Sequence, residues 1–144
     1  MPSVPPDPGS DRDWPPSGCQ DSVGYVVEMD PGGDSVSCWL DIQPQHLNRN
    51  NLLHGGFVAM LLDIACGYAA SLHYDPDNLA LVLTVSLSTQ YIAPARSGRV
   101  TATGRVSGGG KSLCHANGEL RDSDGALIAT ATGVFKRIAK GSKA

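Results

Sequence analysis

Residues 54–72 read HGGFVAMLLDIACGYAASL, an apolar run long enough for about five turns of helix. Asp63 is the only charged residue between positions 57 and 70. A helix that is apolar on nearly all faces is normally buried, and an ionised carboxylate inside it costs several kcal/mol unless it is paired or hydrogen-bonded. We therefore expect a central helix over residues 55–72 in which Asp63 is either held by a partner or functional.

The predicted helix has two distinct faces. Large apolar residues recur at helical spacing from Val58 to Leu72 and predict the face on the core. A second face carries small residues around the acid: Ala59, Asp63, Cys66, Gly67 and Ala70. Because small side chains let another backbone approach closely, we expect this second face to pack on a second copy of the helix.

Alternating apolar residues predict strands on both sides of the helix. Residues 23–29 and 36–42 are expected to form a hairpin, and four further strands are expected over 79–91, 100–106, 113–121 and 127–137. In the first of these four, the odd positions up to Leu87 are apolar, so Thr84 is predicted to share the opposite face with Ser86, Ser88 and Gln90. One helix covering an antiparallel sheet of about six strands is an α+β layer.

Length and composition indicate one domain. The chain has 144 residues and a net charge of −3, which does not suggest a nucleic-acid-binding protein. Residues 1–20 are proline-rich and are expected to form a flexible arm, residues 21–138 the domain, and residues 139–144 a short basic tail. No signal peptide is visible, and the apolar run is judged too short and too polar at its ends to span a membrane. We expect a cytoplasmic protein whose four cysteines are reduced.

Chemistry-bearing residues cluster around the helix: Asn48, the segment His54-Gly55-Gly56, Asp63 and Thr84. The first turn of a helix presents unpaired N–H groups and the positive end of the dipole, and glycines let a substrate oxygen approach them. That arrangement stabilises a carbonyl oxygen as it becomes an oxyanion, and Asn48 could add a second hydrogen bond. Asp63 could activate water as a general base or attack the carbonyl itself.

Helix geometry separates the two halves of this group. Gly55 and Asp63 lie about 12 Å apart along the axis, and the side chains of His54 and Asp63 point to opposite faces. Two antiparallel copies of the helix would instead place the glycine end of one beside the acid of the other. We therefore predict a homodimer with two composite sites.

The spacing Asn48-x5-His54-Gly55-Gly56-x6-Asp63, followed by Gln90-Tyr91-Ile92-Ala93-Pro94-Ala95, resembles the hotdog-fold acyl-CoA thioesterases of the phenylacetate-degradation (PaaI-like) type. The resemblance covers about residues 21–138. It implies one long helix wrapped by an antiparallel sheet, dimers that commonly pair into tetramers, and acyl-CoA as the substrate with no separate cofactor. Membrane and nucleic-acid partners are not expected.

The resemblance also implies roles for individual residues. Asp63 would be the catalytic base or nucleophile, and the Gly55 N–H would polarise the thioester carbonyl with support from His54 and Asn48. Thr84 would hold the attacking water. Gly110 and Lys111, in a glycine-rich turn, would lie near the phosphates of coenzyme A. We expect Gly56, Phe57, Met60, Tyr68 and Tyr91 to contact the substrate, whose acyl group (aryl-acetyl, benzoyl-type or medium-chain) stays open.

Two alternative functions and a metal site are favoured less by the sequence. A hotdog dehydratase or hydratase would use an acid and a histidine on the acyl chain, and an acyl-CoA sensor would bind without turnover. A metal site from His46, His54, Asp63 and His73 is not favoured, because no paired histidine or cysteine spacing supports it. Cys66, next to the acid on the helix, is interpreted as a packing residue.

Overall fold

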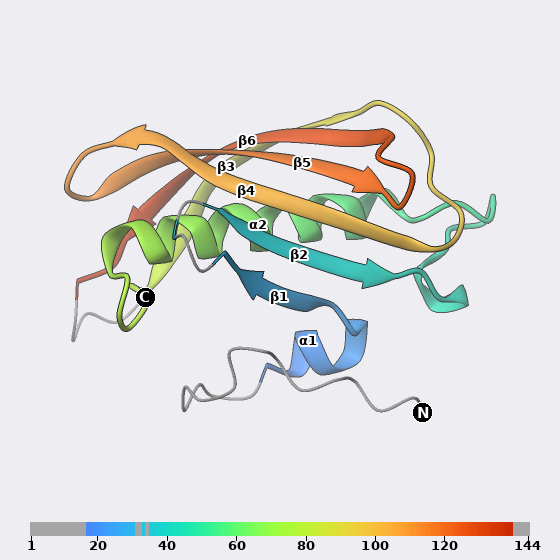
Figure 1. The fold of residues 1–144 in the computed structure, drawn as a ribbon, viewed down its shortest axis with the longest axis horizontal. Helices are drawn as coiled ribbons and strands as arrows, with labels where there is room; N and C mark the ends of the chain where they lie inside the picture. Colours follow the sequence, from blue (N-terminus) through green and yellow to red (C-terminus); the bar gives the residue numbers. More distant parts are fainter. Residues whose placement is uncertain (1–16, 31–32, 34, 140–144) are drawn as a thin grey trace.

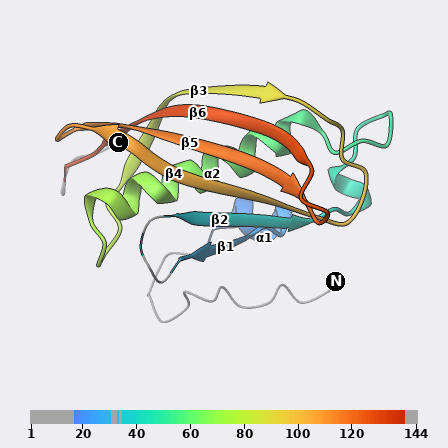
Figure 2. The ribbon, with the colours of Figure 1, turned by 45° about the horizontal axis from the view of Figure 1, so that its top comes forward.

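A long helix and the sheet wrapped around it make up the fold (Figure 1). The computed structural model describes residues 17–30, 33 and 35–139. Helix α2 (Gly55–Tyr74) lies against one face of a six-stranded antiparallel sheet, which confirms the predicted α+β hotdog arrangement. The strands are β1 (Val26–Met29), β2 (Val36–Asp41), β3 (Val82–Tyr91), β4 (Arg99–Gly109), β5 (Leu113–Asp122) and β6 (Leu127–Arg137). Their order is β1-β2-β4-β5-β6-β3, so Figure 2 shows β3 and β1 at the two edges.

Two short helical segments were not predicted, α1 (Gly18–Val23) and the 3-10 turn η1 (Pro44–His46). The Ser17 side chain caps α1 by accepting from the N–H of Gln20, and Gly24 ends it with φ +88°. Val23 was therefore wrongly predicted as strand. Residues 18–20 of the predicted arm form the first turn of α1. Residues 1–16 of that arm, and residues 140–144 of the predicted tail, lie outside the described residues.

Helix α2 rests on a pair of glycines. Gly104 of β4 and Gly118 of β5 are cross-strand partners beneath the middle of the helix. A Cβ on Gly104 would lie 2.5 Å from the carbonyl carbon and oxygen of Ala65, and a Cβ on Gly118 would lie 3.0 Å from the Cys66 sulfur. The helix backbone therefore approaches the sheet backbone at a distance that leaves no room for a side chain on β4.

The small residues of α2 serve this contact with the sheet. Cys66 and Ala70 are buried in a cluster with Phe135 of β6. The prediction that these two residues face a second helix was wrong, because both are fully buried on the side of α2 that faces the sheet. Ala59 and Gly67 of the predicted small-residue face stay partly exposed.

By length and composition alone, α2 could also cross a membrane. The prediction that this run is too short, and too polar at its ends, to span a membrane was therefore wrong. What the structure shows is a core helix, whose face from Val58 to Ala70 is buried against the sheet.

Replacing Gly104 by alanine should destabilise the protein, because the added methyl group would overlap the helix backbone at Ala65. Overpacking typically costs about 1–3 kcal/mol, and a clash with backbone belongs at the upper end. Urea titration of Gly104→Ala should therefore show a free energy of unfolding about 3 kcal/mol below wild type. Gly108→Ala is the control, since no atom lies within 4 Å of its added Cβ. Equal unfolding midpoints for the two variants would contradict this packing.

Candidate active site

Asp63 and Thr84 form a hydrogen-bonded pair beside the edge strand. The Thr84 hydroxyl donates to Oδ1 of Asp63 at 2.7 Å. Asp63 is only partly buried, on the flank of α2 that is turned toward β3. The bond fixes the carboxylate and leaves the lone pairs of the hydroxyl oxygen to accept a hydrogen from another group.

A β-bulge at Val85 aims Thr84 at the acid. In the pairing of β3 with β6, Thr84 lies opposite Phe135, and Ser86 lies opposite the preceding residue of β6, so Val85 is one residue extra. Phe135 is buried beneath the helix, and its cross-strand partner Thr84 therefore faces the helix too. Ser86 is exposed on the outer face of the sheet.

The bulge corrects the predicted alternation along this strand. Thr84 does not share a face with Ser86, Ser88 and Gln90, and Leu83 lies on the outer side although Leu87 packs on the core. An extra residue reverses which side chains face the core on either side of it. Continued alternation in the sequence concealed this reversal.

The first turn of α2 has one backbone donor left open. His54 caps the helix, its Nδ1 accepting from the Gly56 N–H at 2.8 Å. The carbonyl oxygen of His54 accepts from Phe57 and Val58 at 2.9 and 3.2 Å. Within the described part of the chain, the N–H of Gly55 donates no hydrogen bond. A single N–H group at the positive end of the helix dipole is therefore free to bind an oxygen.

Packing also explains why positions 55 and 56 are both glycine. The Tyr91 hydroxyl donates to the carbonyl oxygen of Gly55 at 2.8 Å, and its ring would lie 3.3 Å from a Cβ at that position. A Cβ on Gly56 would lie 3.0 Å from Nδ1 of His54. Tyr91, expected at the substrate, thus holds the helix end, which no pattern in the sequence indicated.

Asn48 lies in the loop that leads to this helix end. Its Oδ1 accepts from the N–H groups of Asn50 and Leu52 at 2.9 and 3.2 Å. The oxygen is therefore used by the loop, and the amide NH2 is the part of the side chain that can donate to a substrate.

A cavity of about 570 Å³ adjoins the Asp63–Thr84 pair. It runs along α2 from Asp63 to Ser71 and is bordered on its other side by the segment from Asn78 to Thr84. Leu79, in its wall, has φ +57°, a conformation that is uncommon for a leucine. Of the expected substrate contacts, Tyr68 lines this cavity.

The remaining expected residues lie elsewhere. Phe57 packs edge-on against the rings of His46 and His54, and Met60 contacts Cys19 of α1. The turn with Gly110 and Lys111 lies at the C-terminal end of α2, where the Tyr74 hydroxyl donates to the Gly110 carbonyl at 3.0 Å. One chain therefore brings together Asp63 with Thr84, and Gly55 with His54 and Tyr91. It does not join the two groups, which stay about 12 Å apart along the helix.

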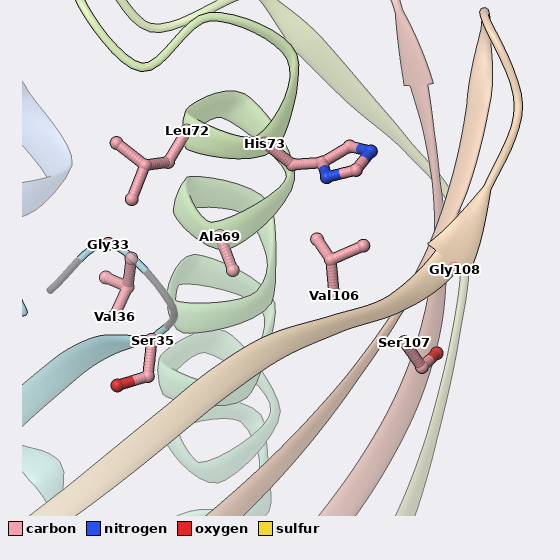
Figure 3. Close-up of a pocket in the computed structure, with 9 residues that line it drawn as sticks. All are labelled: Gly33, Ser35, Val36, Ala69, Leu72, His73, Val106, Ser107 and Gly108. Carbon is pink, nitrogen blue, oxygen red and sulfur yellow. The ribbon is translucent and has the colours of Figure 1, made fainter.

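A second cavity, of about 330 Å³, lies on the other flank of α2 near its C-terminal end (Figure 3). Ala69 and His73 of the helix, Val36 of β2 and Val106 of β4 line it. Figure 3 shows Val106 pointing toward the helix and Ser107 pointing away from it. None of the residues expected for catalysis lines this cavity.

Cys66 is next to the acid but is not a nucleophile. Burial, and secondly the charge of Asp63, raise the pKa of its thiol to about 12. The thiol is therefore protonated at neutral pH, in keeping with a packing role.

Comparison with known proteins agrees with this geometry. Residues 50–129 match the family model described as the thioesterase superfamily. An Archaeoglobus fulgidus protein named "Putative esterase" is 30% identical over 113 residues, which cover 78% of this chain and 70% of the relative. A Salmonella typhimurium protein named medium/long-chain acyl-CoA thioesterase YigI is 30% identical over 96 residues, covering 59% of this chain and 62% of the relative.

Solved structures share the fold. A thioesterase from Haemophilus influenzae superposes with a TM-score of 0.78 at 18% identity, covering 86% of this chain and 85% of that one. The Escherichia coli PaaI protein from the phenylacetic acid degradation operon gives 0.75 at 23% identity, with 85% and 86% covered.

Thiol alkylation should distinguish the four cysteines, which are all free. Cys19 is exposed, whereas Cys38, Cys66 and Cys114 are buried. Burial raises the pKa of Cys38 to about 12, as it does for Cys66. Because the thiolate is the reactive form, iodoacetamide near pH 8 should modify Cys19 alone in the folded protein and all four in urea, as read by peptide mass. Rapid labelling of Cys66 in the folded protein would contradict its packing role.

Proposed function

This chain belongs to the thioesterase superfamily, and we propose that it hydrolyses acyl-CoA thioesters to the free acid and coenzyme A. The observation that carries the proposal is that the chain supplies both a carboxylate held by a hydrogen bond, Asp63 with Thr84, and an open backbone donor, the Gly55 N–H. A base and an oxyanion donor are the two groups that attack on a thioester carbonyl requires.

In the general-base route, water donates its hydrogens to Asp63 and to the oxygen of Thr84, which turns a water lone pair toward the carbonyl carbon. Asp63 takes a proton as the water oxygen bonds to carbon, and the Gly55 N–H binds the carbonyl oxygen as it becomes an oxyanion. Collapse of this intermediate breaks the C–S bond, and the coenzyme A thiolate takes the proton from Asp63.

In the nucleophilic route, a carboxylate oxygen of Asp63 bonds to the carbonyl carbon and expels the thiolate, leaving a mixed anhydride that water then hydrolyses. Both routes consume one water and yield one acid and one thiol. Neither calls for a cofactor.

The two halves of this site are supplied by two chains in our proposal. Two hydrogen bonds tie β3 to both halves, one from Thr84 to Asp63 and one from Tyr91 to Gly55. Thr84 therefore lies beside Asp63, and Tyr91 lies beside Gly55. A two-fold axis that passes midway between Gly55 and Asp63 on the helix would also pass midway between Thr84 and Tyr91 on the strand. Antiparallel pairing of β3 with its copy around that axis would bring the partner's Gly55 to Asp63.

The surface of β3 supports this pairing. It is an edge strand, and its large apolar side chains Leu83 and Val85 are 40% and 58% exposed. Leu81, which directly precedes the strand, is 55% exposed. Open strand edges with apolar side chains are ready to pair with another chain. We propose that β3 pairs with β3 of a second copy to make one continuous sheet, and that such dimers associate further.

For the substrate we propose an aryl-acyl or medium-chain acyl-CoA. Ile64, Tyr68, Leu79 and Leu81 give the cavity beside Asp63 an apolar lining that suits such a group. The names of the Salmonella and Escherichia coli relatives, one for medium/long-chain acyl-CoA and one for phenylacetic acid degradation, support these two classes. The cavity extends toward the end of α2 where Lys111 lies, which supports a contact between Lys111 and the phosphates of coenzyme A.

Removing the base or its partner should slow hydrolysis. We expect Asp63→Asn to lower kcat/KM by about 10²–10⁴-fold, the effect of losing a general base. Thr84→Val should cost about tenfold, as for a lost hydrogen bond to a charged group. Thiol release from a panel of aryl- and alkyl-acyl-CoAs measures both. Thr132→Val, an exposed threonine on the sheet face away from the helix, is the matched control.

Wild-type rates in Asp63→Asn would overturn the role of the acid. Where the rate does fall, single turnover in oxygen-18 water separates the routes, because label in the Asp63 carboxylate requires the anhydride.

Mixing two inactive variants should restore activity if each site uses two chains. Gly55→Pro removes the N–H donor and should keep the helix start, since proline is tolerated at the first helical position and His54 (φ −59°, ψ 135°) suits a following proline. Gly55→Ala, which keeps the N–H, is the control for the added Cβ. Gly55→Pro and Asp63→Asn, unfolded and refolded together, should regain about a quarter of wild-type activity, because half of the dimers are then mixed and each has one intact site. No recovery in dimers shown to be mixed would mean that one chain holds the whole site.

A further inference from the structure

His46 is a fully buried histidine that the proposed chemistry does not use. Only 1% of the surface of His46 is exposed to solvent. Nδ1 accepts from the backbone N–H of Gln43 at 2.9 Å, and Nε2 lies 2.8 Å from the carbonyl oxygen of Val23. A backbone N–H can only donate and a carbonyl can only accept, so the ring is neutral and carries its hydrogen on Nε2. Both ring nitrogens are therefore occupied in one fixed tautomer.

The same residue closes the loop that leads into α2. The His46 carbonyl accepts from the N–H of His54, the helix cap, at 2.9 Å. Leu47 and Leu53 form a β-bridge, and the N–H of Asn48 donates to Leu52 at 2.7 Å. Residues 46–54 thus form a closed loop whose two ends, His46 and His54, are joined by a hydrogen bond.

The His46 ring also contacts the first turn of the helix directly. It packs edge-on against the ring of Phe57, with centroids 5.1 Å apart, and Phe57 in turn packs edge-on against His54 at 6.4 Å. His46 therefore contacts a residue on each side of Gly55 in the sequence, His54 through its carbonyl and Phe57 through its ring. Its Nε2 links this end of the helix to the last turn of α1.

From these contacts we propose that His46 is a positioning residue for thioester hydrolysis. His46 holds the Gly55 N–H and the loop with Asn48 at the place where the carbonyl oxygen must bind. This role for His46 rests on the proposed function. A displacement of about 1 Å in such a donor costs on the order of 10²-fold in rate, although substrate affinity need not change. His46 therefore acts on kcat through Gly55 without touching the substrate.

Three substitutions separate the contacts of the ring. His46→Asn keeps an acceptor near the Gln43 N–H, His46→Gln keeps a donor near the Val23 carbonyl, and His46→Phe keeps only the ring that faces Phe57. Val36→Ala is the control, because it removes buried apolar volume near the other end of α2 and should lower stability without moving the first turn.

The experiment measures kcat and KM for the best acyl-CoA substrate, together with amide hydrogen exchange of residues 46–58. His46→Phe should lower kcat about 10²-fold with KM nearly unchanged. His46→Asn and His46→Gln should fall between it and wild type. Exchange in this segment should accelerate in His46→Phe but not in Val36→Ala.

Two results would overturn the assignment. One is a folded His46→Phe with wild-type kcat, and the other is a loss of kcat in Val36→Ala equal to that in His46→Phe, which would reduce His46 to a stability residue. If wild type releases no thiol from any acyl-CoA, the proposed function fails instead. Hydrogen exchange then decides separately whether His46 holds the helix end, and unchanged exchange in His46→Phe would reject the proposal.

Discussion

The backbone of α2 touches the backbone of β4 at Gly104, and the positions of the functional groups follow from that contact. With no side chain between them, the depth of the helix over the sheet is fixed by hard backbone atoms, which cannot repack as side chains can. The edge strand β3 then lies close enough to α2 for Thr84 to reach Asp63 and for Tyr91 to reach Gly55. The close approach therefore sets the geometry at both ends of the site.

Hydrogen bonding at the helix start selects one donor. A helix leaves its first N–H groups without intrahelical partners. Here the histidine cap binds the N–H of Gly56 through its ring, and its carbonyl binds the next two, so that among the described residues the Gly55 N–H is left open. The oxyanion donor of the proposed reaction is thus defined by which neighbouring groups are already occupied. His46, through Phe57, and Tyr91, through the Gly55 carbonyl, then keep that turn in place.

The edge strand carries two requirements at once. Its inner side must present Thr84 to the acid, whereas its outer edge has no strand partner among the described residues and exposes the apolar side chains Leu83 and Val85. The bulge at Val85 meets the first requirement, because one extra residue turns Thr84 inward while Ser86 stays on the outer face. Bulges at sheet edges also increase local twist, so the same residue affects how β3 can meet a partner.

The sequence by itself determined the fold class, because a helix period over residues 55–72 and strand alternation around it are strong local signals. It also singled out Asp63, Gly55 and Thr84 as a group, although their roles stay predictions. Only the tertiary structure decided which side Thr84 faces and what buries His46. Both depend on hydrogen bonds and packing between segments far apart in the chain, and the local residue pattern is the same with or without those contacts.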